Sequence, residues 1–168
     1  AAGAAAHAAP TTFRIDSVYS NLDGSVQFIR LTEAAGLDGQ HRIAGLKITS
    51  TSHGTTREFT IAHDIPTEYT AHVSIAVVAA PIGGVPIVLN GNTHARWVPY
   101  YTMPERFLPI DGGIVDFAGV DQMAYASLPT DGTQALRVNG TIGPALLPYG
   151  KCPSVPGETR TCPIRFPR

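Results

Sequence analysis

The sequence predicts an all-β sandwich, and three observations lead to this fold class. Charged residues make up only 15% of the 168 residues, while 17 glycines and 14 prolines supply the residues of tight turns. Short segments of alternating apolar and polar residues, bounded by turn residues, recur about every 8–12 residues. No window of about 11 residues or more carries the 3.6-residue apolar period of a helix. Strands joined by short turns, without helices, indicate a sandwich of two sheets.

The first two predicted strands form a hairpin. Residues 12–20 alternate apolar and polar side chains, residues 21–24 (NLDG) are a turn signal, and residues 25–33 form the returning strand. The returning strand has Val26, Phe28 and Arg30 on one face and Gln27, Ile29 and Leu31 on the other.

A second hairpin follows, with residues 43–52 and 55–62 on either side of the dipeptide His-Gly. Residues 71–80 are almost continuously small and apolar, which is typical of a buried strand. The region from Pro81 to Pro109 is irregular. The last predicted strands are residues 113–119, 121–129 and 132–140.

These elements divide the chain into three parts. Residues 1–10 (AAGAAAHAAP) form an Ala-rich N-terminal arm, residues 11–140 form the β-sandwich, and residues 141–168 form a Pro-rich tail. The arm is typical either of the start of a mature chain after signal cleavage, where small residues flank the cut, or of a low-complexity linker.

Charge and hydropathy exclude two classes of partner. The 13 acidic and 12 basic residues nearly cancel, so no basic field attracts nucleic acid. The longest apolar run, residues 73–89, is interrupted by Pro81 and Pro86 and is too short to span a bilayer. We therefore expect neither a nucleic-acid partner nor a membrane span, and no motif indicates a cofactor.

The two cysteines, Cys152 and Cys162, lie near the C-terminus with a Pro-Gly turn between them. Their spacing does not fit a Cys-x-x-Cys redox or zinc pair. The turn can bring the two thiols together, which favours a disulfide and an oxidising compartment. The alternative is two free thiols in a loose tail.

Two segments resemble lamin-tail-type domains of secreted bacterial proteins. FRIDSVYSNLDGSVQFIRLTE resembles their opening strands, and IVDFAGVDQMAYASLPTDGTQALRVNG resembles their closing strands. Asp16 stands at the acidic position of the first strand, whereas Arg30 replaces the glutamate of the second. The resemblance implies an immunoglobulin-like β-sandwich that serves as an extracellular accessory module. It implies no catalytic residue.

The stretch HDIPTEYTAH, residues 63–72, carries the side chains of a metal site. His63, Asp64 and His72 are three zinc-ligand types, Glu68 is of the type that serves as a general base, and His94 is a further candidate ligand. Pro66 argues against the helix that a His-Glu-x-x-His site requires. The stretch is therefore first a loop between two strands, with a metal-dependent enzyme or metal-binding protein as the alternative.

The segment THARWVPYYTMPER holds the densest group of aromatic and cationic residues. Large amphipathic rings beside an arginine suit a glycan or a protein partner. Alternatively, the tryptophan closes one end of the sandwich and the tyrosines cover an edge. The candidate residues are Arg96, Trp97, Tyr100 and Tyr101.

No nucleophile motif is present: the chain lacks a Gly-x-Ser-x-Gly elbow, and the cysteines are expected to be bridged. We therefore predict a secreted, non-enzymatic assembly module that associates with itself. In the sharper form of this hypothesis it is a subunit of an extracellular filament or surface layer, and its N-terminal arm adds to the sheet edge of a neighbour. The alternatives are the metal-dependent protein and a carbohydrate-binding accessory domain.

Overall fold

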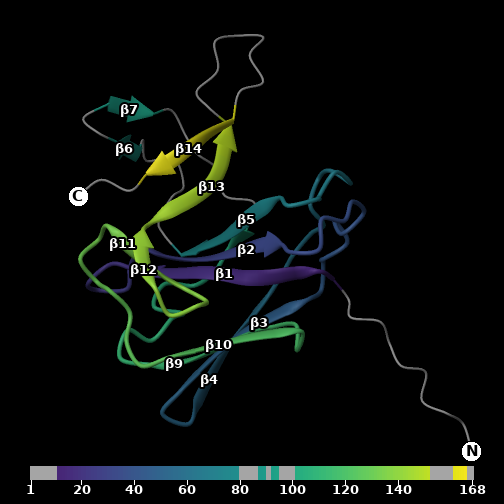
Figure 1. Ribbon diagram of the computed structural model, residues 1–168. Helices are drawn as coiled ribbons and strands as arrows, with labels where there is room; N and C mark the ends of the chain where they lie inside the picture. The colour runs from purple at the N-terminus through teal and green to yellow at the C-terminus, as the bar shows by residue number, and fades with distance from the viewer. Residues whose placement is uncertain (1–10, 80–86, 90–91, 95–100, 152–160, 166–168) are drawn as a thin grey trace, which may run out of the picture.

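The computed structural model describes residues 11–79, 87–89, 92–94, 101–151 and 161–165, of which 87–89, 92–94, 146–151 and 161–165 are described by their backbone alone. All regular elements in these residues are strands, which confirms the predicted all-β class. Two main sheets face each other, as a sandwich requires (Figure 1). No helix of the described residues is long and apolar enough to cross a membrane.

The larger sheet has six strands in the order β12-β11-β1-β2-β5-β8. Its pairs are antiparallel except β5 and β8, which run parallel. The strands are β1 (Phe13–Ser20), β2 (Gln27–Glu33), β5 (Ser74–Ala79), β8 (Tyr101–Thr102), β11 (Gln134–Arg137) and β12 (Ile142–Pro144).

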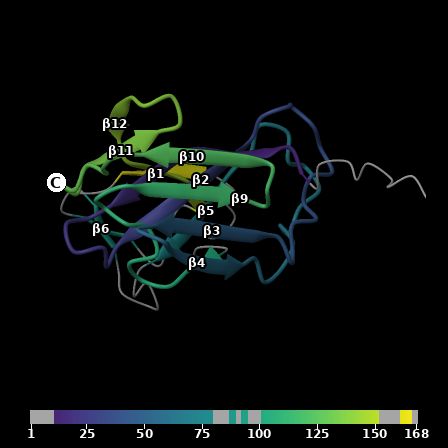
Figure 2. The same cartoon turned by 90° about the horizontal axis from the view of Figure 1, so that it is seen from below.

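The smaller sheet has four antiparallel strands in the order β10-β9-β3-β4. Figure 2 shows these strands side by side, with β4 on the outside. They are β3 (Lys47–Ser52), β4 (Thr55–Thr60), β9 (Gly113–Phe117) and β10 (Asp121–Tyr125). Two short ribbons pair β6 (Ile87–Leu89) with β7 (Asn92–His94), and β13 (Leu146–Lys151) with β14 (Thr161–Arg165).

Both predicted hairpins form. β1 pairs with β2 in the predicted order, and β3 pairs with β4 from Lys47↔Thr60 to Ser52↔Thr55. The second hairpin turns on two residues of positive φ, His53 at 48° and Gly54 at 77°. Two successive residues of positive φ define a turn whose twist matches that of the strands, and glycine adopts this conformation without steric cost.

The main core lies between the two sheets. It contains Ile29, Leu31 and Val77 from the larger sheet and Ile48, Val115 and Phe117 from the smaller one, all fully buried. The sheets are also joined by a hydrogen bond from Ile15 N to Asp121 Oδ2, at 2.8 Å.

A second, smaller core covers the opposite face of the larger sheet. The rings of Tyr19 and Phe28 stack there at a centroid distance of 5.0 Å, next to Ala76, Val78 and Ala145. β13 contacts β5 of the larger sheet (Figure 1). The larger sheet is therefore buried on both faces along β2 and β5, and it includes β12 from the segment that the sequence assigns to the tail.

Candidate functional site

The outer strand of the smaller sheet, β4, is the longest of the edge strands in the two main sheets. Its sequence TTREFT contains neither a proline nor a bulge, and five of its six residues are exposed. In a two-residue hairpin the residues next to the turn form a hydrogen-bonded pair, so Ser52 pairs in this way with Thr55. The backbone groups of every second residue then point to β3, beginning with Thr55.

The intervening residues of β4 point their backbone groups away from β3. These residues are Thr56, Glu58 and Thr60. The hydrogen bond from Ile61 N to Leu46 O, at 2.8 Å, supports this alternation because Ile61 continues the inward series. No described strand pairs with the outward side. β4 therefore presents a regular row of free N–H and C=O groups, which is a template for another strand.

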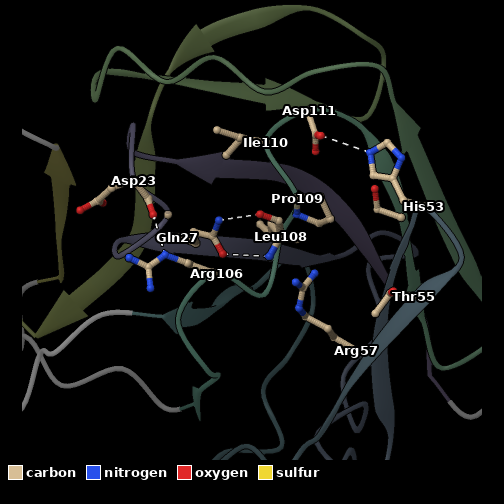
Figure 3. A pocket seen from close by; sticks show the side chains of 12 residues that line it. Asp23, Gln27, His53, Thr55, Arg57, Arg106, Leu108, Pro109, Ile110 and Asp111 are labelled. Atoms are coloured by element: carbon tan, nitrogen blue, oxygen red, sulfur yellow. Dashed lines mark hydrogen bonds and ion pairs between the residues drawn. The ribbon is translucent and has the colours of Figure 1, made fainter.

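The inward-facing side chains of β4 border a groove of about 360 Å³ (Figure 3). Arg57 lies across from buried Ser50, so its side chain projects on the core side of the sheet, where it lines the groove together with Thr55. The β1–β2 turn supplies Asp23 and Gly24, and the segment from Arg106 to Asp111 supplies the remaining wall.

A fully buried glutamine fixes this wall. Leu108 N donates to Gln27 Oε1 at 2.8 Å, and Gln27 Nε2 donates to Leu108 O at 2.7 Å. Nε2 also donates to Ser20 Oγ at 3.0 Å. The segment has no sheet partner of its own, so the amide side chain takes the place of a neighbouring strand. The sequence places Gln27 on the face of Ile29 and Leu31, and a polar residue on an apolar face is the signal that could have identified it.

The rim of the groove is an exposed pair. His53 Nε2 lies 3.1 Å from Asp111 Oδ2, and both side chains are more than two-thirds exposed. The two glycines that follow Asp111 in the sequence permit close packing. A Cβ on Gly112 would lie 2.8 Å from Ala126 O, and one on Gly113 would lie 2.9 Å from Thr51 O. The absence of side chains therefore lets this segment lie directly against the backbone of Ala126 and that of Thr51.

The candidate metal ligands of residues 63–72 lie in the loop between β4 and β5. The ring of His63 packs on the ring of Tyr101 at 4.8 Å, and Asp64 Oδ1 accepts a hydrogen bond from Ala44 N at 2.8 Å. His72 has a φ of 58°, and its N–H donates to Glu33 Oε2 at 3.1 Å. The side chains of His63 and Asp64 are thus engaged with neighbouring loops and strands.

The two remaining candidates of the predicted metal site, Glu68 and His94, do not complete a group of metal ligands in the described residues. Glu68 contributes its backbone oxygen to Gly39 N at 2.7 Å, and the side chain of His94 lies outside the described residues. Within the part of the chain that the structure describes, no group of three His, Cys, Asp or Glu residues could hold a metal ion.

Glu33 is the residue that organises these loops, and sequence reasoning missed it. Its buried carboxylate accepts hydrogen bonds from the hydroxyl of Thr12 and from the N–H groups of Ala35, Gly36, Leu37 and His72. Burial alone would raise its pKa, but these hydrogen bonds outweigh burial and lower the pKa to about 2. The only sign of this role in the sequence is that Glu33 ends the predicted strand SVQFIRLTE, next to a loop.

The predicted aromatic binding residues and the predicted disulfide lie mostly outside the residues that the structure describes. Arg96, Trp97 and Tyr100 lie outside the described residues, whereas Tyr101 is buried and donates its hydroxyl to His63 O at 2.9 Å. Cys152 also lies outside them. Cys162 is described by its backbone, which pairs with Gly150, so the disulfide stays a prediction.

No protein-family model, curated protein or solved structure matches this chain. The resemblance to lamin-tail-type domains therefore stays a prediction.

Proposed function

We propose that this chain is an extracellular, non-enzymatic assembly module with an immunoglobulin-like sandwich, and that copies associate when an extended segment of one adds to β4 of another. The observation that carries the proposal is the row of outward backbone groups at Thr56, Glu58 and Thr60 on an exposed strand. Strand addition satisfies such groups with main-chain hydrogen bonds. The predicted disulfide of the Pro-rich tail supports the proposed extracellular location, because disulfides persist in oxidising compartments.

Charge on β4 disfavours two of the registers in which two β4 strands could pair. A two-fold axis at Glu58 would set this carboxylate opposite its copy, and an axis at Arg57 would set two guanidinium groups opposite each other. Like charges directly opposite each other destabilise an antiparallel pair. These two registers of a symmetric dimer through β4 are therefore unfavourable, and a donor segment without acidic, lysine or arginine residues avoids both.

The N-terminal arm has the composition of such a donor. Residues 1–10 contain small side chains and no acidic, lysine or arginine residue, so they meet neither Arg57 nor Glu58 with a like charge. An arm that joins a different surface of the next copy makes a heterologous contact, which continues into a filament or a layer unless it closes into a ring. This supports the sharper form of the hypothesis from the sequence.

Hydrogen exchange of single amides tests the proposal. The full chain and a chain without residues 1–10 are compared at the same high concentration. We expect the amides of Thr56, Glu58 and Thr60 to be protected only in the full chain, because only there does a strand cover them. The amides of Arg57 and Phe59 face β3 and serve as an internal control that is protected in both. Equal exchange of the outward amides in the two chains would refute the arm as donor.

A further inference from the structure

The groove beside β4 contains a cation that has no hydrogen-bonded or ion-paired partner among the described residues. Figure 3 shows the guanidinium group of Arg57 directed into the groove. Arg57 is exposed and forms no hydrogen bond or ion pair with any described residue. A guanidinium group offers several N–H donors in a planar fork that matches the geometry of a carboxylate or phosphate.

Arg106, the second cation of the groove, is held in a backbone conformation that is uncommon for its residue type. Its φ is 54°, in the left-handed region that residues other than glycine rarely adopt. Arg106 N donates to Gly24 O at 2.9 Å, and Nε donates to Asp23 O at 3.1 Å. Strained residues that the surrounding structure holds in place are concentrated at binding sites.

The tight fit around Arg106 keeps its terminal nitrogens available. Gly24 has a φ of 72°, and a Cβ at this position would lie 3.1 Å from Arg106 Cγ. The stem of Arg106 therefore lies directly on the turn. Only its Nε is used there, and its two terminal nitrogens bond to no described residue.

The two carboxylates that line the groove are already engaged. Asp23 Oδ1 accepts hydrogen bonds from Ser25 N at 3.0 Å and Ser25 Oγ at 2.6 Å. Asp111 faces His53 at the rim. The hydrogen bonds from Ser25 lower the pKa of Asp23, and the positive charge of Arg106 also helps to lower it, so Asp23 and Arg106 attract each other across the groove. The terminal nitrogens of both arginines nevertheless form no hydrogen bond with a described residue.

We infer that this groove binds a small organic acid through a carboxylate or phosphate group between Arg57 and Arg106. Leu108, Pro109 and Ile110 supply an apolar wall for the body of the ligand, and the volume of about 360 Å³ is that of a small-molecule site. Anion binding in the groove is distinct from the proposed assembly: it requires the inward side chain of Arg57, whereas assembly requires the outward backbone groups of β4.

Calorimetric titration of the full chain tests the inference, with glutarate and inorganic phosphate as separate probes at low ionic strength. We expect saturable binding of at least one probe, and the tighter probe identifies the preferred acid group. Arg57→Gln and Arg106→Lys should each weaken binding about tenfold, because each loses charge-assisted hydrogen bonds. Arg42→Gln is the matched control: Arg42 is exposed and lies outside the groove, so binding should stay within about twofold.

Two results would overturn the inference: the absence of saturable binding of both probes, or an equal loss in Arg42→Gln and Arg57→Gln, which would indicate a general effect of net charge. Assembly of Arg57→Gln is measured in parallel by light scattering. Because its outward backbone groups are unchanged, assembly should persist while anion binding weakens, so the outcomes for the groove and for the proposed function are read separately.

Discussion

Gln27 and Leu108 bind each other through two hydrogen bonds, in which a buried side-chain amide pairs with a backbone N–H and C=O. Replacing Gln27 with leucine keeps a similar volume but leaves both backbone groups of Leu108 without this partner. We expect a loss of about 3 kcal/mol in the free energy of unfolding, measured by urea denaturation. Gln27→Glu keeps an acceptor for Leu108 N but loses the donor to Leu108 O, and it also buries a charge. A loss below about 1 kcal/mol in Gln27→Leu would contradict the anchoring role.

Glu33 makes the stability of the protein depend on pH in acid. Its pKa is lowered from 4.5 to about 2 in the folded state, so the stabilisation is complete above about pH 4.5 and is lost as the pH falls towards 2. Glu33→Gln should be less stable by about 2 kcal/mol at pH 7 and should lose less stability over this acidic range. Thermal unfolding from pH 7 to pH 2 measures both effects.

Glu68→Gln serves as the control for acid stability, because Glu68 is exposed and its carboxylate bonds to no described residue. Its pH profile should follow that of the natural chain. If Glu33→Gln also followed that profile, Glu33 would not be the group responsible.

Gly112 is expected to tolerate no side chain. Its φ of 115° is strained for other residues, and a Cβ would also lie 2.8 Å from Ala126 O. Gly112→Ala should therefore cost more than about 3 kcal/mol in unfolding free energy, since strain and overlap add. Gly45→Ala provides the comparison: Gly45 has a φ of 83° but open space around it, so only about 1 kcal/mol should be lost. Similar losses in the two variants would contradict the close approach at Gly112.

His53 occupies the first position of a turn that favours asparagine. His53→Asn creates Asn-Gly, the preferred pair for two residues of positive φ, and removes an exposed contact with Asp111. We expect the hairpin to become more stable by a few tenths of a kcal/mol, measured by chemical denaturation. A clear destabilisation would show that the contact between His53 and Asp111 matters more than the turn.

Local patterns predicted the all-β class and most strands of the two main sheets. Alternation and the turn residues identified both hairpins, because register in a short hairpin depends on nearby residues. Phe28 is buried on the face opposite Leu31. This burial was not predictable, because it depends on apolar residues distant in sequence, such as Ala145, that pack in the second core.

The candidate site was less accessible to sequence reasoning. Gln27 and Leu108 are 81 residues apart, and Glu33 receives its donors from three separate segments. The stretch from His63 to His72 has the residue types of a metal site, yet its described contacts are those of a structural loop. Residue type alone does not distinguish a ligand from a group that satisfies a loop.

The exposed edge of β4 is the feature on which the proposed assembly depends, and Thr56→Pro tests it. Thr56 N–H points away from β3, so proline at this position removes an outward donor without removing a bond of the existing hairpin. Thr56→Val is the matched control, since it also loses the hydroxyl contact with Thr51 but keeps the N–H. Both variants should keep the far-ultraviolet spectrum of the natural chain.

The decisive measurement is sedimentation velocity of the natural chain, Thr56→Val and Thr56→Pro at one concentration. We predict large assemblies for the first two and a folded monomer for Thr56→Pro. Assembly of Thr56→Pro to the same size as the natural chain would contradict the claim that β4 receives a strand from a neighbouring copy.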